Sequence, residues 1–310
     1  MEKRKYEDEF ANDDIQSFDD FDINNITERI DIDVIKEKIE RAKQENPQKK
    51  HENIEKKQEV PIKQETENLI IANEETDNIQ SSNDVIINLN KVGLKYGSEI
   101  VLKEITLDIK KGDFVYLVGE SGAGKSSIIK MLHKEVNNTS GDIYIQNENI
   151  TNLRNKDLPR LRRKIGVIFQ DYKLLSDKTI YQNVAFSLYV TGYPKNMIKK
   201  RVLEVLNKVG IEEQAQKYPD ELSGGQQQRA AIARAIVDEP VILVADEPTG
   251  NLDPENALAI MELLVKINEE GTTVVMATHD VGIVNNFLNR VVLLGEGKVI
   301  KEAKGEYIYE

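Results

Sequence analysis

The chain has 310 residues, a formal net charge of −12, 39% hydrophobic residues and 31% charged residues. This composition suits a globular domain, and no stretch reaches the roughly 18 consecutive apolar residues of a membrane-spanning helix. Cysteine is absent, which excludes disulfides and thiol chemistry. The start, MEKRKYEDEF, has no apolar run behind its basic residues, so we expect no signal peptide.

The negative charge is concentrated at the N-terminus. Residues 1–84 hold 24 acidic and 13 basic side chains, whereas residues 85–310 hold 30 and 29, and all 18 glycines follow residue 84. A segment so polar cannot bury enough apolar surface to offset the entropy lost on ordering. We therefore predict an acidic, largely disordered extension over residues 1–84 and an ordered domain over residues 85–310.

Two features of the extension allow a second interpretation. Tyr6–Asp22 mixes acidic with aromatic residues, and such patches can dock on basic partners. Between Ile26 and Ile39, isoleucines recur near helical spacing, which is compatible with a short amphipathic helix. The extension is thus either a solvated tail with transient helix or a docking segment.

The first chemical motif is a glycine-rich turn. The apolar run FVYLV, Phe114–Val118, predicts a buried strand, and the following GESGAGKS matches the phosphate-loop pattern G-x-x-x-x-G-K-[ST]. Backbone N–H groups of such a loop, and of the helix after it, bind phosphate oxygens. We expect Lys125 to reach the β- and γ-phosphates and Ser126 to place its hydroxyl on Mg²⁺. The predicted nucleotide-binding residues here are Gly119, Glu120, Ser121, Gly122, Ala123, Gly124, Lys125, Ser126 and Ser127.

A second apolar run, Val241–Ala245, predicts another buried strand, which ends in Asp246 and Glu247. An aspartate at the end of such a strand can hold Mg²⁺ directly or through water. The next carboxylate can then polarise a water molecule as a general base. Taken alone, the segment is also compatible with an ordinary acidic strand exit; beside a phosphate loop, the catalytic interpretation is strongly favoured.

A second glycine turn lies in DELSGGQQQRAAIARA, Asp220–Ala235, where a helix is predicted to begin. Free N–H groups and the helix dipole make such a start favourable for an anion. Residues from about 170 to 235 are predicted to be largely helical. One helix is expected over Asn196–Ile211, with its buried face formed by Ile198, Val202, Val205 or Leu206, and Val209.

Four motifs occur in a fixed order: GESGAGKS, LSGGQ at Leu222–Gln226, VILVADE at Val241–Glu247, and the histidine of VVMATHD at Val274–Asp280. Over about residues 85–305 the chain resembles the ATP-binding subunits of ABC transporters. The resemblance implies a Mg²⁺-dependent ATPase with an α/β fold. That fold is an ABC-type P-loop NTPase core with an antiparallel β subdomain near residues 85–110 and a helical subdomain.

The resemblance also implies a role for each matching residue. Glu247, His279 and Gln170 would be catalytic, and Ser126, Gln170 and Asp246 would hold Mg²⁺. Tyr96 would stack on adenine, unless it is a plain strand tyrosine. Asp253 would lie in the loop that crosses between protomers, and Ser223, Gly224, Gly225 and Gln226 would contact the γ-phosphate of ATP bound by a second copy. His51 and His133 match no motif and are expected at the surface.

A finer resemblance comes from LPRLRRKIGVIFQDYKLL, KTIYQNVAF and DEPTGNLDP, which are similar to the FtsE family of cell-division ATPases. This family pairs with the membrane protein FtsX, which implies an FtsX-like integral membrane partner and a homodimer on ATP binding. The implied location is the cytoplasmic face of the cell membrane, without a transmembrane segment in this chain. Partner choice is then expected in Asp171–Leu188. The acidic extension lies outside the family pattern.

Two other functions stay open. The chain is also compatible with the ATPase of a lipoprotein-release or macrolide-export transporter, since these share the DEPTGNLD segment. Alternatively, it is a nucleotide-gated scaffold whose extension, residues 1–84, recruits a division or cytoskeletal protein. Nucleic-acid binding is not expected from a nearly neutral domain with an acidic extension.

Overall fold

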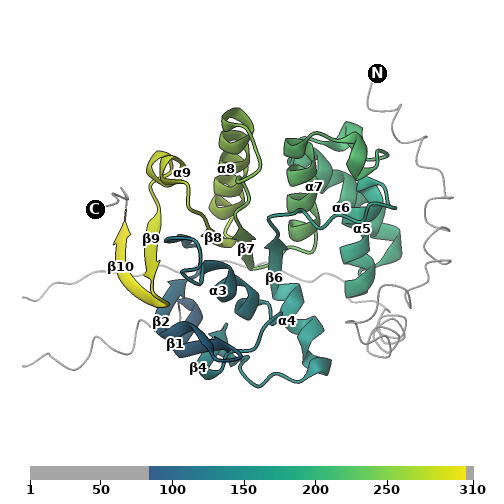
Figure 1. The fold of residues 1–310 in the computed structure, drawn as a ribbon. Coiled ribbons are helices and arrows are strands. Elements are labelled where there is room, and N and C mark those ends of the chain that lie inside the picture. The colour runs from purple at the N-terminus through teal and green to yellow at the C-terminus, as the bar shows by residue number, and fades with distance from the viewer. Residues whose placement is uncertain (1–83, 305–310) are drawn as a thin grey trace, which may run out of the picture. The chain divides into compact units, whose positions relative to one another are not determined.

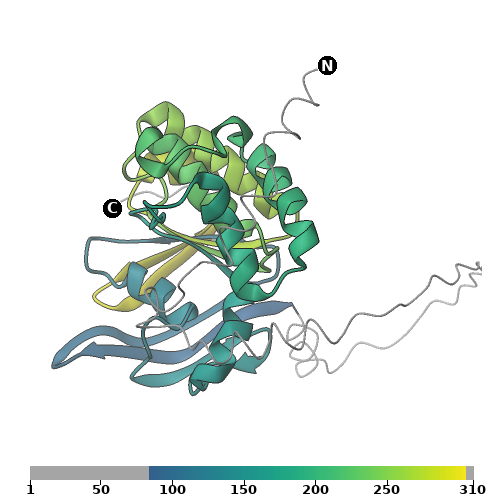
Figure 2. The ribbon, with the colours of Figure 1, turned by 90° about the vertical axis from the view of Figure 1, so that its right-hand side faces the viewer.

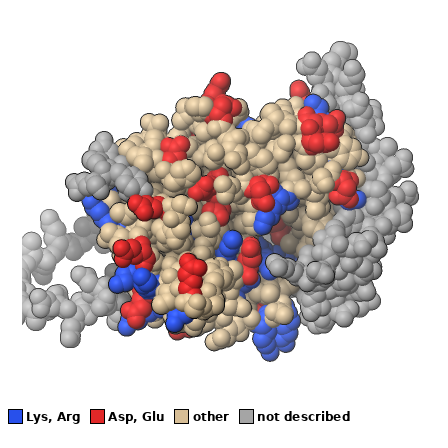
Figure 3. Space-filling view, viewed as in Figure 1, with Lys and Arg blue, Asp and Glu red and all other residues tan. Residues whose placement is uncertain are grey.

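The computed structural model of the chain describes residues 84–304 (Figure 1). The predicted acidic extension, with its Tyr6–Asp22 segment, the helix near Ile26–Ile39 and His51, lies outside the described residues except for Asp84. On the face seen in Figure 3, acidic and basic side chains are intermixed, in keeping with the near-neutral charge of residues 85–310.

A six-stranded sheet has the order β10-β9-β3-β8-β7-β6. Neighbours from β9 to β6 are parallel, whereas the edge strand β10 is antiparallel to β9. Every residue of β3 and of β8 is buried, as expected for parallel strands covered on both faces. The strands span Phe114–Val118 (β3), Ile165–Ile168 (β6), Ile242–Asp246 (β7), Thr273–Ala277 (β8), Arg290–Gly295 (β9) and Lys298–Lys304 (β10).

A smaller antiparallel sheet has the order β2-β1-β4-β5, which confirms the β subdomain predicted near residues 85–110. Along β2, buried Ile105, Leu107 and Ile109 alternate with exposed residues, so one face of this sheet packs inward. The strands span Val85–Tyr96 (β1), Glu99–Lys110 (β2), Ser140–Ile145 (β4) and Glu148–Asn149 (β5).

Helix α3, Lys125–Leu132, lies between the two sheets. Its Ile128, Ile129, Met131 and Leu132 join one apolar core with residues of both sheets. Figure 2 shows the resulting layers, with the blue antiparallel sheet below, the parallel sheet in the middle and green helices above. Helix α8, Pro254–Glu269, belongs to the upper layer, and shorter helices are α4 (Leu158–Lys164) and α9 (Val281–Asn286).

Helices α5 (Ile180–Thr191), α6 (Lys195–Lys208) and α7 (Gly224–Ile236) pack together at the right of Figure 1. The predicted helical region is thereby confirmed. The predicted helix over Asn196–Ile211 begins one residue earlier and ends three residues sooner than expected. All the apolar residues predicted for its face are buried, including both Val205 and Leu206. Single 3₁₀ turns span Asn155–Asp157, Glu212–Gln214 and Pro219–Glu221.

The strand order decides which loops meet. Because β3, β8, β7 and β6 are consecutive parallel neighbours, their carboxyl ends lie along one edge of the sheet. Ligands of open α/β sheets bind at that edge. At these ends lie the predicted phosphate loop, Thr278–His279, Asp246–Glu247 and Phe169–Gln170. The fold therefore brings three of the four motifs and Gln170 to one edge of the sheet.

Within residues 84–304, no helix is both long and apolar enough to cross a lipid bilayer.

Candidate nucleotide-binding and catalytic site

The phosphate loop connects β3 to α3, and its glycines adopt backbone angles that other residues avoid. Gly119, Gly122 and Gly124 have φ of 144°, 84° and 100°. A Cβ on Gly124 would lie 2.3 Å from Cδ2 of Leu102, so β2 packs directly onto the loop. Nothing lies within 4 Å of a Cβ position on Gly122, which leaves the outer side of the loop open to a ligand.

Lys125 is 6% exposed, and its ammonium is held inside the loop. Its Nζ donates to the carbonyl oxygens of Gly119 at 2.7 Å and Glu120 at 2.9 Å. These bonds place one positive charge where the loop closes. The next side chain, Ser126, donates from Oγ to Oδ1 of Asp246 at 2.8 Å. The two predicted motifs are therefore joined by a hydrogen bond, although 120 residues separate them.

The residues predicted to hold Mg²⁺ suit that ion. Ser126 and Asp246 offer a hydroxyl and a carboxylate, and Mg²⁺ prefers oxygen ligands, with further positions filled by water and substrate phosphates. In the described part of the chain, no group of three or more His, Cys, Asp or Glu side chains could hold a metal by itself. A magnesium site here would therefore depend on oxygens of the bound nucleotide.

Burial raises the pKa of Asp246 above its ordinary value, against an opposing effect of the Ser126 hydrogen bond, and the nearby Glu247 charge raises it further. Ionising Asp246 therefore costs more free energy in the ligand-free folded protein than in the unfolded chain. The free energy of unfolding thus falls as the pH rises through the folded-state pKa of Asp246.

We expect Asp246→Asn to raise the melting temperature of the ligand-free protein at pH 7. The gain should shrink as the pH falls through the raised folded-state pKa of Asp246, because the wild-type carboxyl then gains a proton. Thermal melts of both proteins over a series of acidic pH values measure this. A gain that does not depend on pH would contradict the assignment, and Asp177→Asn, at an exposed turn, is the matched control.

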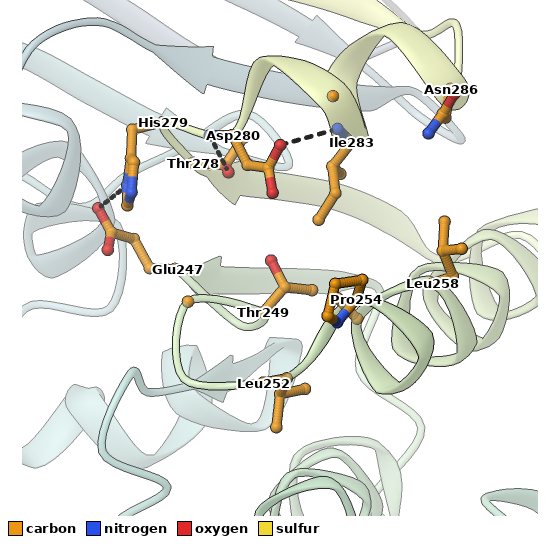
Figure 4. Close-up of a pocket in the computed structure, with 13 residues that line it drawn as sticks. Glu247, Thr249, Leu252, Pro254, Leu258, Thr278, His279, Asp280, Ile283 and Asn286 are labelled. Carbon is orange, nitrogen blue, oxygen red and sulfur yellow. Dashed lines mark hydrogen bonds and ion pairs between the residues drawn. The ribbon is translucent and has the colours of Figure 1, made fainter.

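Glu247 is held at both carboxylate oxygens. Its Oε1 lies 3.0 Å from Nδ1 of His279, and its Oε2 accepts from Nε2 of Gln170 at 3.3 Å. Because a carboxylate only accepts, His279 carries its hydrogen on Nδ1. Figure 4 shows the Glu247 and His279 side chains pointing toward one another. The three residues predicted to be catalytic are therefore brought together from β6, β7 and β8.

The backbone fixes Glu247 in an unusual conformation. Its φ is 46°, a left-handed value that is costly for a residue with a side chain. Two backbone hydrogen bonds stabilise this conformation. The N–H of Glu247 donates to the oxygen of Ala277 at 3.0 Å, and the N–H of Gly250 donates to the oxygen of Glu247 at 3.2 Å. The Glu247 side chain is 21% exposed and that of His279 is 64% exposed, so both are open to solvent or a ligand.

A cavity of about 320 Å³ lies beside Glu247, between α8 and α9 (Figure 4).

Asp253 immediately precedes α8, and its carboxylate accepts hydrogen bonds from N and Nδ2 of Asn256 at 3.0 and 2.6 Å. These hydrogen bonds lower the pKa of Asp253. The predicted interprotomer residue is thus, in one chain, the N-cap of its own helix.

The second glycine turn begins α7. Ser223 and Gln226 form a capping box, in which the Ser223 N–H donates to Oε1 of Gln226 at 3.0 Å. A Cβ on Gly225 would lie 2.6 Å from Oδ1 of Asn256, so the turn packs closely against the start of α8. Among the described residues, no hydrogen bond or ion pair joins Ser223–Gln226 to the phosphate loop. Within one chain, the structure therefore shows no such bond between the two predicted phosphate-binding turns.

Tyr96 ends β1 and is 46% exposed, opposite Glu99 across a tight turn. The same hairpin packs on the phosphate loop through Leu102. The ring is therefore free for a ligand on an element that contacts the loop, as adenine stacking requires.

His133 corrects one expectation. It was expected at the surface but is 7% exposed, with Nδ1 2.8 Å from the oxygen of Ile129 and Nε2 3.1 Å from Glu135. A histidine just after α3 folds back onto the last turn, where a free carbonyl is available. The sequence also missed Asn251, whose Nδ2 donates to the oxygen of Gln170 at 3.4 Å.

Comparisons with known proteins agree with this geometry. A model of the ABC transporter family matches residues 102–250. The cell division ATP-binding protein FtsE of Streptococcus pneumoniae strain D39 is 48% identical over 227 residues, 73% of this chain and 99% of that protein. The methionine import ATP-binding protein MetN of Carboxydothermus hydrogenoformans is 46% identical over 199 residues, 64% of this chain and 59% of that protein.

A solved structure is similar over the same region. It is a dimeric ATP-binding cassette in a post-hydrolysis state, bound to ADP and Pi. Its TM-score is 0.65 at 38% sequence identity, and the match covers 72% of this chain and 100% of that one. The fold, the gathered motifs and these similarities lead to one conclusion: the chain belongs to the ABC transporter family and is an ATP-binding subunit with ATPase activity.

Proposed function

We propose that the chain hydrolyses ATP through Glu247 and, as a homodimer, drives an FtsX-like integral membrane protein in cell division. The observation that carries the catalytic part is the carboxylate of Glu247, fixed between Gln170 and His279 beside the Ser126–Asp246 pair. The similarity to FtsE over 99% of that protein's length supports the division role.

In this proposal the phosphate loop and Lys125 bind the β- and γ-phosphates of ATP. Ser126, Asp246 and Gln170 would hold Mg²⁺, which would neutralise charge on those phosphates. Glu247 accepts a proton from the attacking water, whose oxygen forms a bond to the γ-phosphorus as the bond to the ADP oxygen breaks. His279 orients the Glu247 carboxylate and lies near the γ-phosphate.

The lack of a hydrogen bond between the two glycine turns supports a dimer. Ser223–Gln226 begins a helix whose free N–H groups favour an anion, yet among the described residues no hydrogen bond or ion pair joins it to the phosphate loop of its own chain. Two copies related by a twofold axis would place this turn, and the Asp253 loop, against ATP bound by the other copy. ATP then stabilises the closed pair, and hydrolysis releases it. The similar cassette with ADP and Pi is a dimer.

The membrane partner is proposed to contact Asp171–Leu188, which follows Gln170 and leads into α5. The chain would then lie at the cytoplasmic face of the cell membrane as a peripheral subunit. Purification of the chain from solubilised membranes, with identification of the proteins recovered alongside it, tests this proposal. Recovery of an FtsX-like protein is expected, whereas recovery of a small-molecule permease would favour the second candidate, a methionine-import type ATPase, suggested by the similarity to MetN.

Removing residues 2–83 is expected to leave ATP hydrolysis within about twofold of the full chain, because residues 96–279 include every proposed site residue. Phosphate release by both purified proteins measures this. The same deletion in cells tests the role of the extension. Normal cell division would show that the extension is dispensable. Intact ATP hydrolysis with failed recruitment of a division or cytoskeletal protein would favour the scaffold role. A large loss of hydrolysis would contradict the predicted boundary.

A further inference from the structure

The four residues Gln170–Lys173, here called the elbow, turn sharply after β6. Tyr172 and Lys173 have φ of 58° and 47°, so two consecutive residues with side chains adopt the left-handed conformation. Such a pair is unfavourable for L-residues and persists only when its surroundings hold it. Nearby contacts do so in part: the Lys173 ammonium lies 4.2 Å from the centre of the Phe169 ring, and Asn251 donates to the oxygen of Gln170.

Arg234, in the last turn of α7, supplies the strongest hold on the elbow. Its Nη2 donates to the oxygen of Tyr172 at 2.8 Å, and its Nη1 to the oxygen of Lys173 at 2.6 Å. Burial lowers the pKa of Arg234 to about 10, against the opposing charge of Asp171, and the guanidinium stays protonated at neutral pH. The planar guanidinium presents donors on two nitrogens in a rigid fork and so fixes the positions of both carbonyls, whereas an ammonium offers all its donors from one freely rotating point.

Tyr172 reaches the other end of the same helix. Its hydroxyl lies 3.4 Å from where a Cβ on Gly224 would be, and Cδ2 of Leu252 lies 3.5 Å from that point. Helical side chains point back toward the helix start, so the Arg234 side chain extends along α7 toward Gly224. The elbow is therefore hydrogen-bonded to the last turn of α7 through Arg234, and its Tyr172 hydroxyl lies close to the first turn of the same helix, which is about 20 Å long.

We propose that Tyr172 and Arg234 are positioning residues that fix the start of α7 relative to Gln170. The turn Ser223–Gln226 then reaches the ATP of a second copy only while the elbow keeps its conformation. This inference rests on the proposed function, because it concerns the same ATP-dependent dimer. Displacing Gln170, by a nucleotide or by a membrane partner, would move the second phosphate-binding turn through these two contacts.

The test uses the full chain carrying Glu247→Gln, in which ATP-bound dimers should accumulate. The measurement is the ATP concentration that gives half-maximal dimer by analytical ultracentrifugation. Tyr172→Ala and Arg234→Lys should each raise it about tenfold or more, since small displacements of binding groups have effects of this size. Binding of a fluorescent ATP analogue to the monomer should stay within about twofold, because among the described residues no hydrogen bond joins Tyr172 or Arg234 to the phosphate loop.

Arg229→Lys is the matched control. Arg229 lies in the same helix and donates from Nη1 to the oxygen of Val209 at 2.7 Å, away from the elbow. This variant should dimerise at the parent's ATP concentration. Because Tyr172 and Arg234 act through one segment, the double variant should shift the concentration by less than the product of the single shifts.

Equal ATP requirements for the parent and for the elbow variants would overturn the inference and leave the proposed function standing. A shift in Arg229→Lys as large as in the other two would show general loosening of the helices and would also overturn it. A parent that never dimerises would remove the proposed function and the inference together. If Arg234→Lys does not fold, Tyr172→Ala, at a half-buried loop position, decides the matter alone.

Discussion

Glu247→Gln is expected to lower ATP turnover by roughly 10²- to 10⁴-fold, the range of general-base catalysis, with ATP binding intact. The amide keeps the size of the carboxyl and can still accept from Nδ1 of His279. Gln170 can rotate its own amide so that its oxygen meets the new N–H groups. The variant loses only the group that accepts a proton from water.

Phosphate release measures the loss, and size analysis with ATP measures its structural consequence. The variant should form dimers with ATP and remain monomeric without it, because ATP stays unhydrolysed between the copies. A strictly monomeric profile with ATP would contradict the proposed dimer. His279→Ala is the informative companion, since it removes the support of Glu247 but leaves the carboxylate, and it should retain more activity than Glu247→Gln.

Lys125→Ala is expected to weaken ATP binding by about 10- to 100-fold, since a charged hydrogen bond contributes about 1.5–3 kcal/mol. The ammonium is already seated between the oxygens of Gly119 and Glu120, so it is preorganised for phosphate. Its removal also leaves these carbonyls without that donor.

Titration with a fluorescent ATP analogue measures the affinity. Lys130→Ala makes the same change in net charge within the same helix and should bind nearly as well as the parent. Normal affinity in Lys125→Ala would overturn the assignment of the phosphate loop. Thermal melts should show both variants folded, because the Lys125 side chain bonds only to the backbone of its own loop.

The local elements could be predicted because buried parallel strands are continuous apolar runs. The structure confirms Phe114–Val118 as a strand, and the second predicted strand, Val241–Ala245, is shifted by one residue to Ile242–Asp246. The phosphate-loop residues, Asp246 and Glu247 were predicted from their motifs, whereas the roles of Gln170 and His279 were implied by the resemblance to ABC ATP-binding subunits. No local pattern specifies that Gln170, Glu247 and His279 meet, because they converge only through the strand order β8-β7-β6.

The elbow could not be predicted at all. Tyrosine and lysine normally avoid left-handed backbone angles, so the residue types at Tyr172 and Lys173 do not predict a sharp turn. It depends on a guanidinium that lies more than sixty residues further along the chain. The burial of His133 escaped prediction for a similar reason, since its partner is a backbone oxygen rather than a side chain.

Residues 1–83 join the described part of the chain at Asp84. The N–H of Lys111 donates to the oxygen of Asp84 at 2.8 Å, just before β3 starts. Asp84 therefore lies near the amino end of β3, whereas the phosphate loop follows the carboxyl end of that strand. The five residues of β3 span about 17 Å. The attachment point of residues 1–83 therefore lies at the edge of the sheet opposite the proposed ATP site.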